Sequence, residues 1–228
     1  WVRHTQYSPA CNQLPNLLKP ESLRMKKHIT DIRIQNEQPA HCSIFMDGVF
    51  FALVEIGLVT KFGLRIGLEI EEIVIQKLIV ADEVMRARNH ALNLLLRESY
   101  SNGQMMDALE KRGFGQAAIN ETLKNLEEQG HIRDQKYAER WVAGRRRTRP
   151  AGRKVLTHEL IDKGIDKGTV DRVVGQIDDE DEKQIALHIA QRQARRYRSL
   201  PQHVAQRRLR GFLVRRGFDY GTIQRTIK

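Results

Sequence analysis

The chain has 228 residues, a formal net charge of +11 and an aromatic fraction of 6%. This length suits one large domain or several small ones, and a hydrophobic fraction of 40% supports a modest buried core. So few aromatic residues exclude a sheet that stacks on single-stranded RNA, and two cysteines exclude a disulfide framework. No apolar run approaches a membrane span and no secretory signal is evident, so a soluble, cytoplasmic protein is expected.

The positive charge is confined to one end of the chain. Residues 1–138 hold 17 basic and 17 acidic side chains, whereas residues 139–228 hold 22 basic and 11 acidic ones. Most of this excess is arginine. Such a concentration predicts a surface that meets a polyanion or an acidic protein, in preference to a merely solvated face.

The first part of the chain is predicted to form an extension and a small β domain. Residues 1–24 contain three prolines and little apolar periodicity, which indicates a flexible extension. Residues 25–84 then hold three short apolar runs, and Asp47-Gly48 between the last two is a hairpin signal. We expect a three-stranded meander packed on a helix whose apolar residues are Ile70, Val74, Ile75 and Leu78.

From residue 85 onward the chain repeats one helical pattern three times. A leucine, a glycine four residues later and an apolar residue directly after the glycine occur at Gly113, Gly164 and Gly217. Further apolar residues recur six, ten and thirteen positions after each glycine: Ile119, Val170 and Ile223, then Leu123, Val174 and Ile227, then Leu126 and Ile177. The glycine indicates a helix end in the left-handed conformation, and the later residues form one apolar stripe on the next helix.

The residues around each glycine predict how the helices begin. Asp166 and Asp219 are suitable N-caps for the helix after the glycine, and Gly115 is a weaker equivalent. Ser101 and Gln104 form a capping box for the helix before the first glycine. With one more helix ahead of each copy, the unit has three helices. We therefore expect a mainly α chain in which three-helix repeats at 85–133, 134–181 and 182–228 build an elongated, curved body.

Several short stretches occur in an order and spacing that are specific together. They are Phe45–Phe50, Ala91–Leu95 followed by Tyr100-Ser101, Gly130–Asp134 with Tyr137-Ala138, Glu159-Leu160 with Lys163–Ile165, and Phe212-Leu213 with Arg216–Phe218. In these stretches the chain resembles the RecX family, bacterial regulatory proteins that modulate the RecA recombinase. Arg133 stands where the family carries the first of two aspartates, and Asp134 is still expected to cap the helix that follows. Arg153 follows Gly152 where the family often has proline.

The resemblance implies a regulator that binds the RecA–DNA filament. A curved array would lie in the helical groove of the filament and contact the phosphates of single- or double-stranded DNA. Such binding would mostly inhibit strand exchange, ATP turnover and repressor cleavage by RecA, in DNA repair and the SOS response. The expected chain is a monomer that needs no cofactor and no membrane.

Three sets of basic residues are the candidates for binding the filament or DNA, because guanidinium groups grip phosphates and carboxylates in bidentate fashion. The sets are Arg145, Arg146, Arg147, Arg149, Arg153 and Lys154; then Arg192, Arg195 and Arg196, followed by Arg198; and then Arg207, Arg208, Arg210, Arg215 and Arg216. Neutralising Arg145, Arg146, Arg147 and Arg149 is expected to weaken binding more than neutralising Arg207, Arg208 and Arg210. For every set, helix capping or a plain solvated face remains the alternative.

Nothing in the sequence points to catalysis or to a metal. The acidic run Asp178–Glu182 is predicted to open a helix, and Tyr137 and Trp141 are expected in the core. No HExxH, P-loop or GxSxG motif is present, so a protein that is not an enzyme is expected. The alternative function is an architectural protein that binds DNA directly without RecA, which a steep salt dependence of binding would identify.

Overall fold

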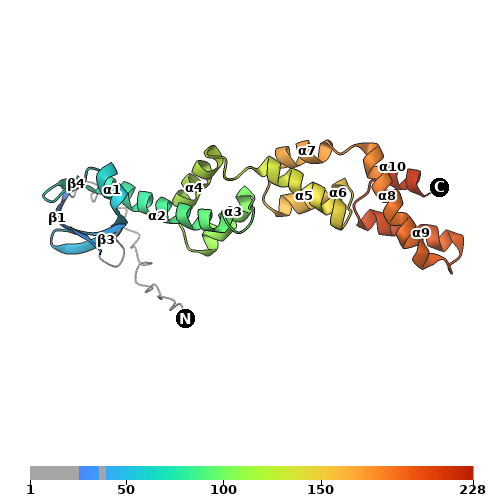
Figure 1. Cartoon of the computed structure of the whole chain (residues 1–228), viewed down its shortest axis with the longest axis horizontal. Helices are drawn as coiled ribbons and strands as arrows, with labels where there is room; N and C mark the ends of the chain where they lie inside the picture. The colour runs from blue at the N-terminus through green and yellow to red at the C-terminus, as the bar shows by residue number, and fades with distance from the viewer. Residues whose placement is uncertain (1–25, 36–39, 228) are drawn as a thin grey trace. The chain divides into compact units, whose positions relative to one another are not determined.

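The computed structural model describes residues 26–35 and 40–227, which form two compact units that divide between Asp82 and Glu83. Figure 1 shows the helices and strands of both units in chain order. The extension predicted for residues 1–24 lies outside the described residues.

The first unit is built on an antiparallel sheet. Its strands are β1 (Lys26–Ile34), β2 (His41–Met46), β3 (Val49–Glu55) and β4 (Glu69–Glu71), in the order β3-β2-β1-β4. Asp47 and Gly48 both have positive φ, 50° and 80°, as a two-residue hairpin between twisted strands requires. Ile29 and Ile44 are fully buried and form part of the core of the sheet.

The three predicted strands are confirmed, but a fourth strand that was not predicted joins the sheet from a distant part of the chain. Ile70 was expected in a helix, but it lies in β4, where it pairs with Lys27 and is buried. The short helix α1 (Ile56–Lys61) separates β3 from β4. Helix α2 (Glu72–Leu95) follows β4 and buries Ile75 and Leu78, as expected for the apolar face of this helix.

The second unit consists of three triplets of helices. The first triplet comprises the part of α2 from Glu83 onward, α3 (Asn102–Lys111) and α4 (Gln116–Glu128). The second comprises α5 (Asp134–Thr148), α6 (Arg153–Asp162) and α7 (Lys167–Gly175). The third comprises α8 (Asp179–Ala194), α9 (Gln202–Arg215) and α10 (Tyr220–Thr226), with a 3-10 turn, η3 (Arg195–Tyr197), after α8.

The predicted helix ends are confirmed in all three triplets. Gly113, Gly164 and Gly217 follow the middle helices α3, α6 and α9 with φ of 90°, 72° and 84°. Asp166 and Asp219 cap α7 and α10 by accepting the backbone N–H groups of Thr169 and Thr222. The capping box of Ser101 and Gln104 opens α3, and Gly115 precedes α4 without a side-chain cap.

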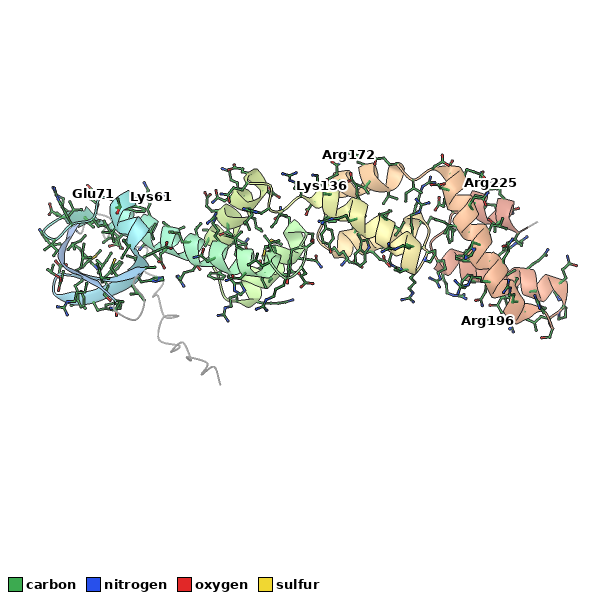
Figure 2. The ribbon with its side chains drawn as sticks, viewed as in Figure 1. Lys61, Glu71, Lys136, Arg172, Arg196 and Arg225 are labelled. Atoms are coloured by element: carbon green, nitrogen blue, oxygen red, sulfur yellow. The ribbon has the colours of Figure 1, made fainter. Side chains whose placement is uncertain are left out.

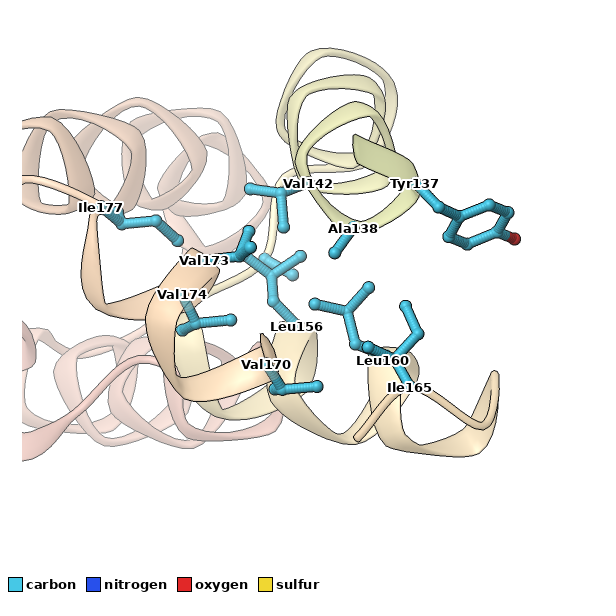
Figure 3. Packing of buried hydrophobic residues seen from close by; sticks show 11 residues of the cluster. Tyr137, Ala138, Val142, Leu156, Leu160, Ile165, Val170, Val173, Val174 and Ile177 are labelled. Atoms are coloured by element: carbon cyan, nitrogen blue, oxygen red, sulfur yellow. The ribbon is translucent and has the colours of Figure 1, made fainter. Parts of the chain in front are cut away.

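Each triplet buries its own hydrophobic core. The apolar residues at six, ten and thirteen positions after the glycines are all buried, as predicted. In the second triplet, Ala138 and Val142 of α5 point toward Leu156 and Leu160 of α6 and Val170 of α7 (Figure 3). The corresponding clusters of the first and third triplets include Leu109 and Leu213, which are fully buried.

Consecutive triplets meet through their middle helices, end to end. The hydroxyl of Ser101, the N-cap of α3, donates to the carbonyl of Lys163 at the end of α6, where Cα atoms of Gly103 and Gly164 come very close. The backbone N–H of Gly152, the N-cap of α6, donates to the carbonyl of Arg216 at the end of α9 over 2.8 Å. Because a helix N-terminus is positive and a C-terminus negative, this arrangement is electrostatically favourable at both junctions.

A carboxylate from the next triplet completes each junction. Asp134, the first residue of α5, accepts the N–H of Asn102 over 2.8 Å, and Glu182 of α8 accepts the N–H of Arg153 over 2.9 Å. Each carboxylate stands four residues before a fully buried alanine, Ala138 or Ala186. The expectation that Asp134 caps its own helix was therefore wrong. Arg133 is the N-cap of α5, and Asp134 caps α3.

The pKa of Asp134 gives this junction a testable pH dependence. Burial raises the pKa of the Asp134 carboxyl, the N–H of Asn102 opposes the rise, and Glu127 and Asp166 add to it. The folded chain thus favours the protonated form, so the cost of ionising Asp134 is present at neutral pH and disappears as the pH falls below the unfolded pKa. Asp134→Asn is expected to be at least as stable as the parent chain at neutral pH, with an advantage that vanishes in acid.

The measurement is the free energy of unfolding in urea at neutral and acidic pH. Asp134→Ala serves as the matched variant, because alanine leaves the N–H of Asn102 without an acceptor and should cost about 1 kcal/mol at neutral pH. Equal losses for the asparagine and alanine variants at neutral pH would contradict this account of the carboxyl.

Candidate nucleic-acid interface

The arginine cluster at the end of α5 does not form one surface. The Nε of Arg145 donates to both carboxylate oxygens of Glu159 on α6, at 3.0 and 2.8 Å, and Trp141 Nε1 donates to the same carboxylate. Burial alone would raise the pKa of Glu159, but the hydrogen bonds and the charge of Arg145 lower it. Only 16% of the Arg145 side chain is exposed, so this residue holds α5 to α6.

Arg153 also has a structural position. Its guanidinium reaches Asp179 Oδ1 at 2.6 Å and Glu182 Oε2 at 2.8 Å, and it donates to the carbonyl of Ile177. Burial would lower the pKa of Arg153, yet these two carboxylates raise it above its usual value. The Glu182 side chain is 3% exposed, which makes Arg153 the main counter-charge of a buried acid at the second junction.

The acidic run opens α8, as predicted, and joins the second triplet to the third. Asp178 caps α8 by accepting the N–H groups of Glu180 and Asp181 at 2.9 and 3.2 Å. Asp181 also lies 3.5 Å from the guanidinium of Arg146. Among the residues from 26 to 35 and 40 to 227, no three histidine, cysteine or acidic side chains gather in a group that could hold a metal ion.

Three guanidinium groups come together where α9 ends. Arg216 donates to the carbonyl of Pro150 at 3.3 Å and lies over the Phe212 ring, with 5.4 Å from Cζ to the ring centroid. Burial lowers the pKa of Arg216, and the nearby charges of Arg149 and Arg145 lower it further. Although Arg149 and Arg216 are 67 positions apart in sequence, the structure thus places them in one region of positive potential.

The remaining candidates are exposed and, within the described part of the chain, form no ion pair with an acidic side chain. They are Arg147, Arg149, Lys154, Arg192, Arg195, Arg196, Arg198, Arg207, Arg208, Arg210 and Arg215. Arg196 is labelled on η3 in Figure 2. The guanidinium of Arg208 lies 5.9 Å from the Tyr197 ring centroid, which brings the second and third sets together around this turn. Exposed guanidinium groups without partners are available to bind phosphate or carboxylate.

Other basic residues in the same triplets were not among the predicted candidates. Arg172 of α7 and Arg225 of α10 are exposed (Figure 2). Neither belongs to a run of basic residues. Both stand eight positions after a repeat glycine, and this shared position is the only sequence signal that could have identified them as candidates. Arg172 already donates to Gln135 at 3.2 Å, and Arg225 lies 3.4 Å from Thr222 Oγ1.

The carboxy-terminal half of the chain matches two family models. The model described as RecX, second three-helix domain, matches residues 134–174, and the RecX third three-helix domain matches residues 179–227. The regulatory protein RecX of Streptomyces lividans is 35% identical over 147 residues, which are 64% of this chain and 78% of that protein. The chain belongs to the RecX family. This agrees with the resemblance expected from the sequence.

Other relatives extend the match over the β unit. The RecX protein of Bacillus licheniformis is 27% identical over 201 residues, 88% of this chain and 76% of that protein. A crystal structure of regulatory protein RecX has the same fold, with a TM-score of 0.72 at 24% identity over 88% of this chain and 98% of the other. RecX from Lactobacillus salivarius has a TM-score of 0.61 at 26% identity over 64% of this chain and 96% of the other.

The RecX relatives are named regulatory proteins, which supports a regulatory role for this chain. In the part of the chain that the structure describes, no helix is long and apolar enough to cross a bilayer.

Proposed function

We propose that this chain binds the RecA–DNA filament and inhibits the recombinase, ATPase and coprotease activities of RecA in DNA repair and the SOS response. It acts by binding, without catalysis of its own. Membership in the RecX family supports the regulatory role, and the resemblance names RecA as its object. The contact with the filament is made by the exposed members of the three predicted sets of basic residues.

One observation carries this proposal. Seven arginines on α8, η3 and α9, together with Arg198 directly after η3, are exposed and form no ion pair among the described residues, whereas Arg145 and Arg153 are held by internal carboxylates. A chain that neutralises its structural arginines and leaves the others open presents those others to an external anion. Phosphates of filament-bound DNA and acidic side chains of the filament protein are both suitable partners.

The decisive measurement is the ATPase activity of RecA assembled on single-stranded DNA. Adding the full chain in amounts stoichiometric with RecA is expected to lower the rate of ATP hydrolysis. The chain should hydrolyse no ATP when it is incubated with DNA in the absence of RecA. An unchanged ATPase rate across a salt series would overturn the proposal.

A second candidate function is architectural binding of DNA without RecA, which the same unpaired arginines favour. Direct binding to duplex DNA should weaken steeply with salt, with a log–log slope of about 0.9 per phosphate contact. If the chain binds bare DNA as tightly as it binds RecA-coated DNA, the architectural function is the better description. Preference for the coated strand supports the RecA filament as the target.

A further inference from the structure

A groove of about 840 Å³ lies within the second unit, and none of its lining residues belongs to the three predicted sets of basic residues. Its walls are the end of α2, the segment before α3, the connection from α4 to α5, and the first turns of α5. Its apolar lining residues are Leu92, Leu95, Leu96, Tyr100 and Tyr137. Leu96 is 85% exposed, although it stands beside other leucines at a helix end. Pockets of this size commonly hold ligands or peptide side chains.

One side of this groove is basic and lacks acidic partners. Arg133, Lys136 and Arg140 line it, and no described carboxylate forms an ion pair with any of them. The two carboxylates in the lining face their own neighbours. Glu98 accepts the hydroxyl of Tyr100 at 2.8 Å, and Glu139 accepts the side-chain amide of Gln135 at 3.1 Å. Lys136 is labelled at the start of α5 in Figure 2.

The second junction of the same chain shows how such a groove is closed. The fully buried Ala87, Ala138 and Ala186 set a common register for α2, α5 and α8. In this register Leu95 corresponds to Arg146, and Arg133 corresponds to Asp181. At the second junction Arg146 and Asp181 lie 3.5 Å apart and bridge the two triplets. At the first junction the same two places hold a leucine and a cation, so no ion pair closes the groove.

We infer that this groove binds an acidic peptide segment of another protein. An apolar side chain of the peptide rests on Leu92, Leu95 and Leu96, and its carboxylates face Arg133, Lys136 and Arg140. The chemistry of the occupant follows from the lining, which supplies apolar surface and positive charge and lacks the acid that closes the other junction. A nucleic acid fits less well, because three of the five apolar lining residues are leucines, which offer no aromatic face for a base to stack on.

The inference is independent of the proposed function and can be tested without RecA. The probe is a fluorescein-labelled synthetic peptide in which leucines recur at helical spacing between aspartates and glutamates. Saturable binding to the full chain, followed by fluorescence anisotropy, is expected. A peptide with the same leucines and lysines in place of the acids should not bind. Absence of saturable binding, or equal binding of the basic peptide, overturns the inference.

Charge reversal locates the site. Lys136→Glu combined with Arg140→Glu is expected to weaken binding of the acidic peptide about tenfold or more. The matched control is Lys111→Glu with Lys124→Glu, which changes the net charge equally at exposed residues outside the groove and should weaken binding less than about twofold. Equal effects of the two double variants would mean general attraction to a basic protein and would overturn the inference.

A photo-crosslink at the groove distinguishes a peptide from a nucleic acid. Leu96→p-benzoylphenylalanine places the crosslinker at an exposed side chain, so the fold should be unchanged. Irradiation should join the acidic peptide to residue 96 but not to the same group placed at Val214, an exposed apolar residue of α9. Crosslinking of an oligothymidylate at residue 96 in place of the peptide would show that the groove belongs to a nucleic-acid surface.

Discussion

Gly164→Ala is expected to destabilise the chain by about 2–5 kcal/mol, because backbone strain and a steric clash add together at this position. The residue has a φ of 72°, where an alanine costs about 1–2 kcal/mol. An added Cβ would also lie 2.5 Å from the Cα of Gly103, so the first two triplets would have to move apart. Overpacking of this kind costs about 1–3 kcal/mol more. The free energy of unfolding in urea measures the loss.

Two other glycines separate the backbone strain from the junction contact. Gly113 has the same place in the first triplet and a φ of 90°, but nothing lies within 4 Å of an added Cβ. Gly113→Ala should therefore lose only the about 1–2 kcal/mol of backbone strain. Gly103 has helical φ, so Gly103→Ala would gain up to about 1 kcal/mol of helix propensity if the contact were unimportant. Because an added Cβ would lie 2.5 Å from the Cα of Gly164, Gly103→Ala is expected to lower the free energy of unfolding instead. Equal losses at Gly113 and Gly164 would show that the junction is not a tight contact.

Neutralising Arg195, Arg196 and Arg198 together is expected to give the largest loss of binding to the filament or to DNA. These side chains are exposed without acidic partners, so their glutamine variants should leave the fold intact. If each contacts one phosphate of duplex DNA, the log–log salt slope falls by about three and binding weakens most at low salt. A filter-binding or anisotropy titration across a salt series gives both quantities.

The matched control removes the same charge from the first triplet. Lys111, Arg112 and Lys124 are exposed, and their triple glutamine variant should change the salt slope by much less than one. Arg145→Gln tests the other side of the argument, because its pairing with Glu159 means that it should lower stability more than binding. If the two triple variants weaken binding equally, binding depends on the net charge of the chain and not on the position of Arg195, Arg196 and Arg198.

Two of the four arginines at the end of α5 have structural partners, so neutralising all four does not measure binding alone. Replacing Arg145, Arg146, Arg147 and Arg149 together would remove the partner of Glu159 and the Arg146–Asp181 pair along with two exposed side chains. Any loss of binding would then combine unfolding with lost contacts. Arg147, Arg149 and Lys154 are the residues of this set that test binding alone.

The repeat was predictable because its signals are local. A glycine after a leucine, an aspartate two residues later and an apolar stripe on the next helix each depend on neighbours within one or two turns. The fourth strand was not predictable in the same way. β4 has three residues, and Ile70 continues the apolar spacing of α2, so only pairing with β1, far away in sequence, makes it a strand.

For the candidate site, the sequence predicted where basic residues are concentrated but not which of them are exposed and unpaired. The basic excess and the end of α5 in the arginine run were evident from the sequence. Which arginines are internally paired depends on Glu159 and Glu182, which come from other helices. Glu159 lies 14 positions from Arg145 and Glu182 lies 29 positions from Arg153, so neither pairing is visible in the local sequence. The role of Asp134 was missed for a related reason, since the helix that it caps belongs to the preceding triplet and lies 32 positions away.

The end-to-end contacts of α3, α6 and α9 have a consequence for how the gene can change. Both contacts use backbone carbonyls and glycines, so most surrounding side chains can be substituted without breaking them. A deletion or duplication between equivalent positions, such as Ser101 and Gly152, would join a helix N-terminus to the same kind of glycine end. The array can therefore shorten or lengthen by a whole triplet while every remaining junction keeps its geometry.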